Sequence, residues 1–195
     1  MLIFLTIILI TIVLFLNFPL FGKHPTGERR KRIDNSPNFK KGEAQNLIPT
    51  PQLTDGYTLT KVMKEYLFGS KKNVKPKAEV PHHKMDLHAM DLNQDAFIWL
   101  GHSSYFVILQ GQTFLIDPVL TNNAAPIFGS NKAFEGTSFL DFSDIPNINY
   151  LLITHDHYDH LDYKSIKRLK PKIKNVICGL GVGSHLEHWG YTSSI

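Results

Sequence analysis

The sequence has almost no cysteine and shows no internal repeat. Its single cysteine, Cys178, excludes an internal disulfide and any zinc site built on cysteine ligands. The composition excludes a collagen, a coiled coil and a wholly disordered chain. With 195 residues, 43% of them hydrophobic, the chain is long and apolar enough for one domain with a buried core.

The N-terminus lacks the features of a cleaved signal. No Lys or Arg precedes the apolar run that starts at Leu2, no small-x-small cleavage site follows it, and no cysteine near its end could carry a lipid. Roughly twenty residues at about 1.5 Å each can cross a hydrocarbon core of about 30 Å. We therefore predict a transmembrane anchor over residues 1–21, with export to the periplasm after signal cleavage as the alternative.

Charge is unevenly distributed along the chain. Residues 23–77 carry thirteen Lys and Arg against five Asp and Glu, a balance of +8, whereas residues 78–195 carry eight against twelve, a balance of −4. A basic stretch after an apolar start favours contact with anionic lipid over nucleic acid, although a solvated linker explains it equally well. We interpret residues 22–57 as a basic linker, and the positive-inside rule places the following domain in the cytoplasm.

Residues 58–195 are predicted to form a folded α/β domain. Helices are expected from Thr58 to Gly69, from Tyr163 to Leu169 with Asp162 as N-cap, and up to about Trp189 behind a capping box of Ser184 and Glu187. Apolar and β-branched runs predict strands at 97–100, 105–109, 113–116, 150–154 and 176–178. Antiparallel strands followed by alternating helices and strands indicate a mixed sheet covered by helices.

The residues that carry chemistry directly follow the buried strand at 150–154. They are His155, His157, Asp159 and His160. Side chains two apart in an extended stretch point the same way, so His155 and His157 can share one metal ion. Asp159 and His160 lie where the chain turns into a helix and can point at a second ion. Imidazole and carboxylate without thiolate suit zinc, with manganese or iron as alternatives. A His-rich surface loop is the competing interpretation.

The pattern H-x-H-x-D-H after a hydrophobic strand resembles the signature of the metallo-β-lactamase fold, an αββα sandwich of metal-dependent hydrolases. Three further segments, at 99–104, 115–118 and 180–186, strengthen this likeness. Together they are similar to the branch that holds N-acylphosphatidylethanolamine-hydrolysing phospholipase D and ascorbate-phosphate lactonase. The likeness covers about residues 60–195.

This resemblance implies a role for each motif residue. His155 and His157 would bind the first zinc ion, and Asp159 and His160 the second. A metal-bound hydroxide would be the nucleophile, and Asp159 would orient it as the catalytic residue. Asp117 would support the metal loop, residues 155–160, by fixing the imidazole of one of its ligands. The alternative is that Asp117 only ends a strand as part of an Asp-Pro pair. For His102 we expect a structural role rather than a ligand role.

The family's remaining ligands are a downstream His, a bridging Asp and a last His. Only thirty-five residues follow His160, and they contain no such Asp or terminal His. The second β-layer of the sandwich is also missing. We therefore expect an N-terminal fragment that holds the N-terminal half of the αββα sandwich, with one sheet face left open.

The predicted function is that of a membrane-anchored, zinc-dependent hydrolase. The resemblance favours a phosphodiesterase of phospholipase D type that acts on a membrane phospholipid. A lactonase of the same fold is one alternative, and a non-catalytic, membrane-tethered zinc-binding fragment is another. The expected partners are a phospholipid or another phosphodiester and the membrane, without nucleic acid; a homo-oligomer is left open.

Overall fold

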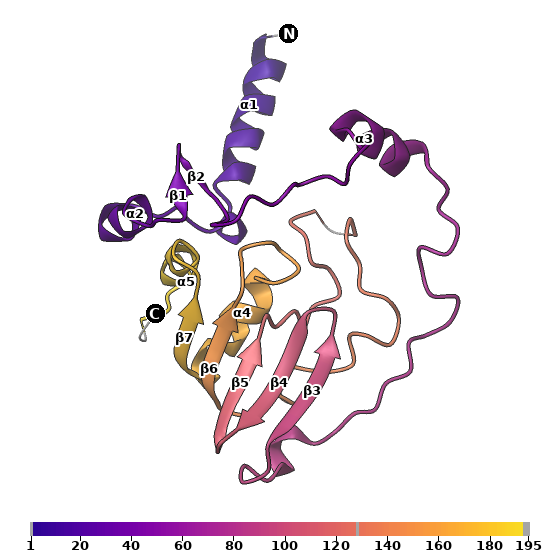
Figure 1. The fold of residues 1–195 in the computed structure, drawn as a ribbon, viewed down its shortest axis with the longest axis vertical. Coiled ribbons are helices and arrows are strands. Elements are labelled where there is room, and N and C mark those ends of the chain that lie inside the picture. The colour runs from indigo at the N-terminus through magenta and orange to yellow at the C-terminus, as the bar shows by residue number, and fades with distance from the viewer. Residues whose placement is uncertain (1, 128, 193–195) are drawn as a thin grey trace.

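The computed structural model describes residues 2–127 and 129–192 (Figure 1). Its centre is a five-stranded sheet in the order β3-β4-β5-β6-β7. The strands are β3 (Ala96–Gly101), β4 (Ser104–Leu109), β5 (Gln112–Ile116), β6 (Ile148–Ile153) and β7 (Ile173–Cys178). β3, β4 and β5 are antiparallel neighbours, whereas β5, β6 and β7 run parallel. The mixed sheet predicted from the sequence is confirmed.

One face of the sheet is buried beneath helices and loops. α4 (Tyr163–Leu169) follows β6, the 3-10 helix η3 (Lys170–Lys172) leads into β7, and α5 (Gly183–His188) follows β7 (Figure 1). As predicted, Asp162 is the N-cap of α4 and accepts a hydrogen bond from the backbone N–H of Ser165. The core joins sheet and helix side chains that are fully buried, among them Phe106, Leu115, Leu151, Ile166 and Leu186.

The opposite face of the sheet is apolar and largely open. The strand register places a largely apolar set of side chains on it, which includes Phe97, Trp99, Tyr105, Val107, Leu109, Phe114, Ile116, Tyr150, Leu152, Asn175 and Ile177. Phe97, Trp99 and Ile177 are each about half exposed or more, at 66%, 49% and 51%. Aromatic rings pair across the strands on this face: Phe114 stacks on Tyr150, and Phe97 lies tilted against Tyr105. The alternation of burial along each strand therefore reflects one covered face and one open apolar face.

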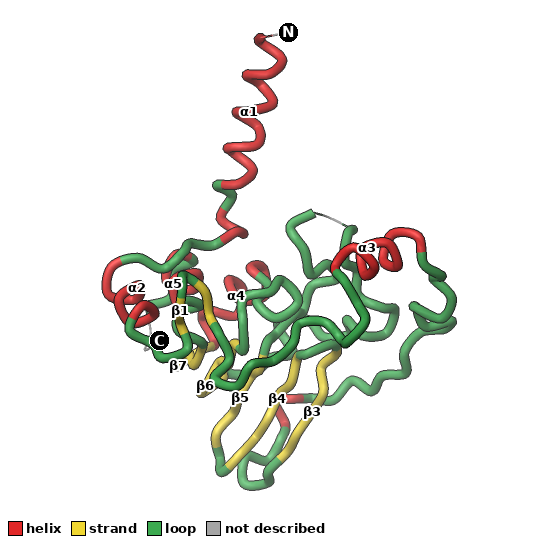
Figure 2. The backbone as a smooth tube through the Cα atoms, turned by 45° about the horizontal axis from the view of Figure 1, so that its top comes forward, coloured by secondary structure: helices red, strands yellow, loops and turns green. Residues whose placement is uncertain are grey.

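The N-terminal segment differs from its prediction. α1 (Leu2–Leu16) has fifteen residues and projects away from the rest of the chain (Figure 2). At about 1.5 Å per residue it is about 22 Å long, because Asn17 and Pro19 end it early, whereas a bilayer's hydrocarbon core measures about 30 Å. Among the described residues, no helix combines the length and apolarity needed to cross a bilayer. The predicted single-pass anchor over 1–21 is contradicted, and with it the cytoplasmic placement inferred from that anchor.

Residues 19–34 span the end of the predicted anchor and the start of the predicted basic linker, and they contact α5 and its C-cap residue Trp189. They contain the 3-10 helix η1 (Pro19–Phe21) and α2 (Gly27–Asp34). The indole N–H of Trp189 donates to the Pro19 carbonyl at 2.7 Å, and Arg29 forms an ion pair with Glu187 at 2.6 Å. The predicted capping box is wrong, because α5 begins without a side-chain cap and Glu187 faces Arg29 instead.

Between α2 and the sheet the chain is mostly irregular. It forms a small hairpin of β1 (Phe39–Lys40) and β2 (Glu43–Ala44), then α3 (Leu59–Phe68), then the 3-10 helix η2 (Leu87–Ala89). α3 is the helix predicted to open at Thr58, and the Thr58 hydroxyl caps it by accepting from the N–H of Lys61. α3 has no buried residue, and its apolar stripe is mostly exposed, with only Val62 partly covered among the described residues.

Candidate metal centre

The parallel strands bring the motif to one edge of the sheet. β5 ends before Asp117, and β6 ends before Thr154 and the histidines that follow it. Because parallel strands end at the same edge, Asp117 and Thr154 lie side by side, and the backbone N–H of Asp117 donates to the Leu152 carbonyl at 3.0 Å. The carboxyl ends of these strands are the place where α/β folds build their sites.

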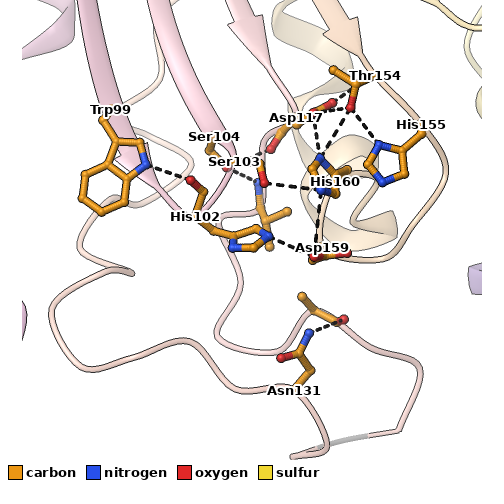
Figure 3. A network of polar contacts seen from close by, with 12 residues as sticks. Trp99, His102, Ser103, Ser104, Asp117, Asn131, Thr154, His155, Asp159 and His160 are labelled. Atoms are coloured by element: carbon orange, nitrogen blue, oxygen red, sulfur yellow. Dashed lines mark hydrogen bonds and ion pairs between the residues drawn. The ribbon is translucent and has the colours of Figure 1, made fainter. Parts of the chain in front are cut away.

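Asp117 is the buried support of the loop. Its carboxylate, 2% exposed, accepts from the Thr154 backbone N–H at 2.8 Å and from the Thr154 hydroxyl at 2.6 Å. It also lies 2.9 Å from Nδ1 of His160 (Figure 3). The backbone of Asp117 has φ +41°, in the left-handed region, which an Asp adopts more readily than most residues.

This contact sets the orientation and tautomer of His160. A carboxylate only accepts hydrogen bonds, so Nδ1 of His160 carries a hydrogen, and in the neutral imidazole Nε2 then keeps the lone pair. Nε2 lies 3.9 Å from the Asp159 carboxylate and 3.4 Å from the Ser103 hydroxyl. Asp117 therefore turns the free nitrogen of His160 towards Asp159, which is the geometry expected of a residue that supports a metal ligand.

His155 lies against His160, and His157 lies against His155. The ring of His155 is 3.9 Å from that of His160 and 4.6 Å from that of His157, measured between centroids. The Thr154 hydroxyl lies 2.9 Å from Nδ1 of His155, which leaves Nε2 of that ring available. The four predicted site residues are thus gathered in one turn after β6.

A residue that the sequence reasoning assigned to structure also enters the cluster. Nε2 of His102 lies 2.9 Å from the Asp159 carboxylate, and its ring is 5.7 Å from that of His160 (Figure 3). His102 comes from the turn between β3 and β4, about fifty residues before the motif. The sequence feature that could have pointed to His102 is its position after Gly101 at the end of a predicted strand. The sequence alone does not show that this strand end lies beside the metal-binding motif.

Asp159 is held in its charged form. Burial raises the pKa of this carboxyl, but hydrogen bonds from its own backbone N–H and from His102 outweigh it, aided by the nearby imidazole of His160. The pKa of Asp159 therefore lies below its ordinary value. An ionised carboxylate amid imidazoles is the donor set that divalent transition metals prefer.

The residues fit a metal ion. Among the described residues, one group of three offers ligand atoms that all lie within 4.8 Å of one another, and it consists of His102, Asp159 and His160. His155 and His157 are adjacent to this group without belonging to it. The structure thus brings Asp159 and His160 together and adds His102 as their neighbour.

A cavity of about 710 Å³ opens beside the loop. Asp156, His157 and Asp159 line one part of it, whereas Leu20 and Phe21 of η1 line another. His185 of α5 also lines the cavity, with Nε2 3.6 Å from the Asp156 carboxylate and Nδ1 accepting from the backbone N–H of Lys23 at 3.1 Å. Burial lowers the pKa of His185, against the opposing effect of Asp156.

Part of the chain matches a known protein family. Residues 112–195 match the family described as Beta-lactamase superfamily domain. This segment starts at β5 and includes Asp117, the whole metal loop, α4, β7 and α5. This part of the chain, less than half of its length, is therefore similar to the beta-lactamase superfamily.

Individual relatives extend the likeness. An uncharacterized protein of Mycobacterium tuberculosis is 28% identical over 160 residues, which make up 80% of this chain and 42% of that protein. N-acyl-phosphatidylethanolamine-hydrolyzing phospholipase D 1 of Caenorhabditis elegans is 38% identical over 80 residues, 39% of this chain and 22% of the enzyme. A UPF0173 metal-dependent hydrolase of Caldivirga maquilingensis is 33% identical over 63 residues, 32% of this chain and 22% of that protein. The chain thus spans less than half the length of these relatives.

Among solved structures, CmlA, a diiron beta-hydroxylase from Streptomyces venezuelae, is 29% identical to this chain over the residues that align. The alignment covers 52% of this chain and 20% of the hydroxylase, with a TM-score of 0.39. At that TM-score the likeness does not establish a shared fold.

Proposed function

We propose that this protein is a metal-dependent phosphodiesterase of phospholipase D type that acts on a phospholipid, with His155, His157, Asp159 and His160 as metal ligands. The observation that carries the proposal is the gathering of these four side chains at the carboxyl end of β6, with Asp117 aligning His160. The 38% identity to a nematode phospholipase D supports the choice of a phosphodiester over other bonds that hydrolases cleave.

The chain's own residues prepare the site for such ions. Asp117 holds the hydrogen of His160 on Nδ1, so that Nε2 can act as a ligand. Hydrogen bonds keep Asp159 ionised, which supplies negative charge for a cation and an acceptor that can orient a water molecule. When bound, divalent cations lower the pKa of coordinated water towards neutrality and neutralise negative charge on a phosphoryl oxygen.

The cavity supports a substrate with both a charged and an apolar part. Its wall joins the metal loop, at His157 and Asp159, to the apolar side chains of Leu20 and Phe21. A phospholipid places an anionic phosphodiester next to acyl chains, so its two parts match the two walls. Zinc is the metal proposed for the site, with manganese or iron as substitutes to be tested.

Hydrolysis assays on the metal-loaded protein test this proposal. The substrates are N-acyl-phosphatidylethanolamine, a simple aryl phosphodiester and an aryl lactone, each assayed with zinc, manganese or iron(II). We expect phosphodiester turnover that falls at least about 100-fold in Asp159→Ala and His160→Ala, because even outer partners of metal ligands contribute about 10–100-fold. His83→Ala, an exposed histidine remote in sequence from the loop, is the matched control and should keep full activity.

The alternatives give different results. Lactone cleavage without phosphodiester cleavage would replace the proposal with a lactonase. Tight zinc binding without turnover of any of the three substrates would refute the hydrolase and favour a protein that sequesters zinc.

A further inference from the structure

We propose that His102 is a metal ligand, and that its Nε2 completes a three-residue site with the carboxylate of Asp159 and an imidazole nitrogen of His160. The inference shares the metal centre with the proposed function but does not depend on the reaction catalysed there. It replaces the structural role that the sequence suggested for His102.

The distances between the donor atoms carry the inference. Nε2 of His102 lies 2.9 Å from Oδ2 of Asp159, and the same oxygen lies 3.9 Å from Nε2 of His160. The three residues offer ligand atoms that are all within 4.8 Å of one another. Donors about 2.0–2.1 Å from a tetrahedral zinc ion are separated by about 3.3 Å, so small side-chain rotations would bring these atoms to ligand spacing.

The backbone of the turn between β3 and β4 fixes the position of His102 near Asp159. His102 has φ +43°, a left-handed conformation, and follows Gly101 with φ +104°. A Cβ at Gly101 would lie 2.5 Å from the Thr137 carbonyl, so only glycine fits there. The indole N–H of Trp99 donates to the His102 carbonyl at 2.8 Å and holds the turn (Figure 3). Strained backbone that is locked from several sides is typical of functional sites.

Burial does not explain the position of His102. Its side chain is 58% exposed, whereas that of His160 is 19% exposed. A histidine that serves only packing is ordinarily buried with its partners, but this imidazole reaches from a surface turn to a carboxylate.

The competing explanation is that His102 only positions Asp159 by a hydrogen bond. His102→Gln separates the two, because the glutamine amide can donate to the carboxylate but replaces the imidazole ligand. His102→Ala removes both functions, and His83→Ala again serves as a control at an exposed histidine.

The experiment is a cobalt(II) titration of the chain and its variants, followed by visible absorption, with X-ray absorption spectroscopy to count imidazole ligands. We expect His102→Ala and His102→Gln to weaken cobalt binding at least about 10-fold, to change the ligand-field bands and to lower the imidazole count by one, whereas His83→Ala changes none of these. Thermal melting checks that each variant folds. Normal affinity and an unchanged imidazole count in folded His102→Gln would overturn the inference and leave His102 as a positioning residue.

Failure here and failure of the proposed function are distinguishable. If cobalt binds through the motif without His102, the inference is lost and the hydrolase stands. If His102 proves to be a ligand but no substrate is turned over, the inference stands and the hydrolase is lost.

Discussion

Asp117→Asn perturbs the metal loop without changing its shape. Oδ1 of Asp117 accepts a hydrogen bond from the Thr154 backbone N–H. Because this N–H can only donate, the side-chain oxygen of the new Asn must occupy the position of Oδ1. The amide nitrogen then takes the place of Oδ2, facing the Thr154 hydroxyl and Nδ1 of His160. Nδ1 can no longer donate there, so its hydrogen moves to Nε2 and blocks the lone pair that faces Asp159.

The expected loss is about 10–100-fold in metal affinity, the range observed when a partner of a metal ligand is removed. This corresponds to about 1.4–2.7 kcal/mol of binding free energy. A competition titration of zinc against a chromophoric chelator measures the loss. The free energy of unfolding should change by less than the roughly 1–3 kcal/mol of an unpaired buried group, because the amide can still pair with both Thr154 atoms.

Asp162→Asn is the matched control for this prediction. Asp162 is also buried, but its carboxylate accepts from the backbone N–H and hydroxyl of Ser165 and from the Thr121 hydroxyl, away from the histidines. We expect it to keep the helix cap, because Asn caps a helix about as well as Asp, and to leave zinc affinity unchanged. Equal zinc affinity in Asp117→Asn and the unsubstituted chain would refute the tautomer argument.

Three further predictions concern stability, each measured by urea unfolding. Phe106→Ala should cost about 3–5 kcal/mol because the ring is fully buried in the core; a cost below 1 kcal/mol would contradict that packing. Tyr191→Phe should cost about 1 kcal/mol, since the buried hydroxyl donates to the Ile166 carbonyl at 2.8 Å; no change would mean that this bond is not formed in solution. Glu187→Gln should cost at most about 1 kcal/mol at neutral pH, because Glu187 is half exposed. The hydrogen bond from Arg29 lowers the pKa of Glu187, so the ion pair stabilises the fold above the ordinary carboxyl pKa of about 4.3 and is lost as pH falls through the lowered value. A cost that persists at pH 3 would contradict the ion pair.

Local patterns were sufficient to predict the sheet and the central helices. The β-branched and aromatic runs mark all five strands, because alternation and apolar runs are properties of neighbouring residues. Asp162 was identifiable as an N-cap for the same reason, since it acts three residues away on Ser165. The gathering of His155, His157 and His160 also follows from spacing within one turn.

Contacts between distant segments were not predictable from one sequence. Glu187 has the spacing of a capping box with Ser184, but Arg29, 158 residues earlier, takes it as an ion-pair partner. His102 reaches Asp159 only because β3 and β4 fold beside β5 and β6. The anchor prediction failed because apolarity alone does not fix where a helix ends, and Asn17 and Pro19 end α1 at fifteen residues.

The central claim is that the turn after β6 holds metal. Equilibrium dialysis against zinc, followed by elemental analysis of the protein, tests it most directly in the unsubstituted chain and in a variant with His155, His157, Asp159 and His160 all changed to Ala. We predict at least one zinc ion per unsubstituted chain and essentially none in the variant. The same zinc content in both proteins would contradict the claim.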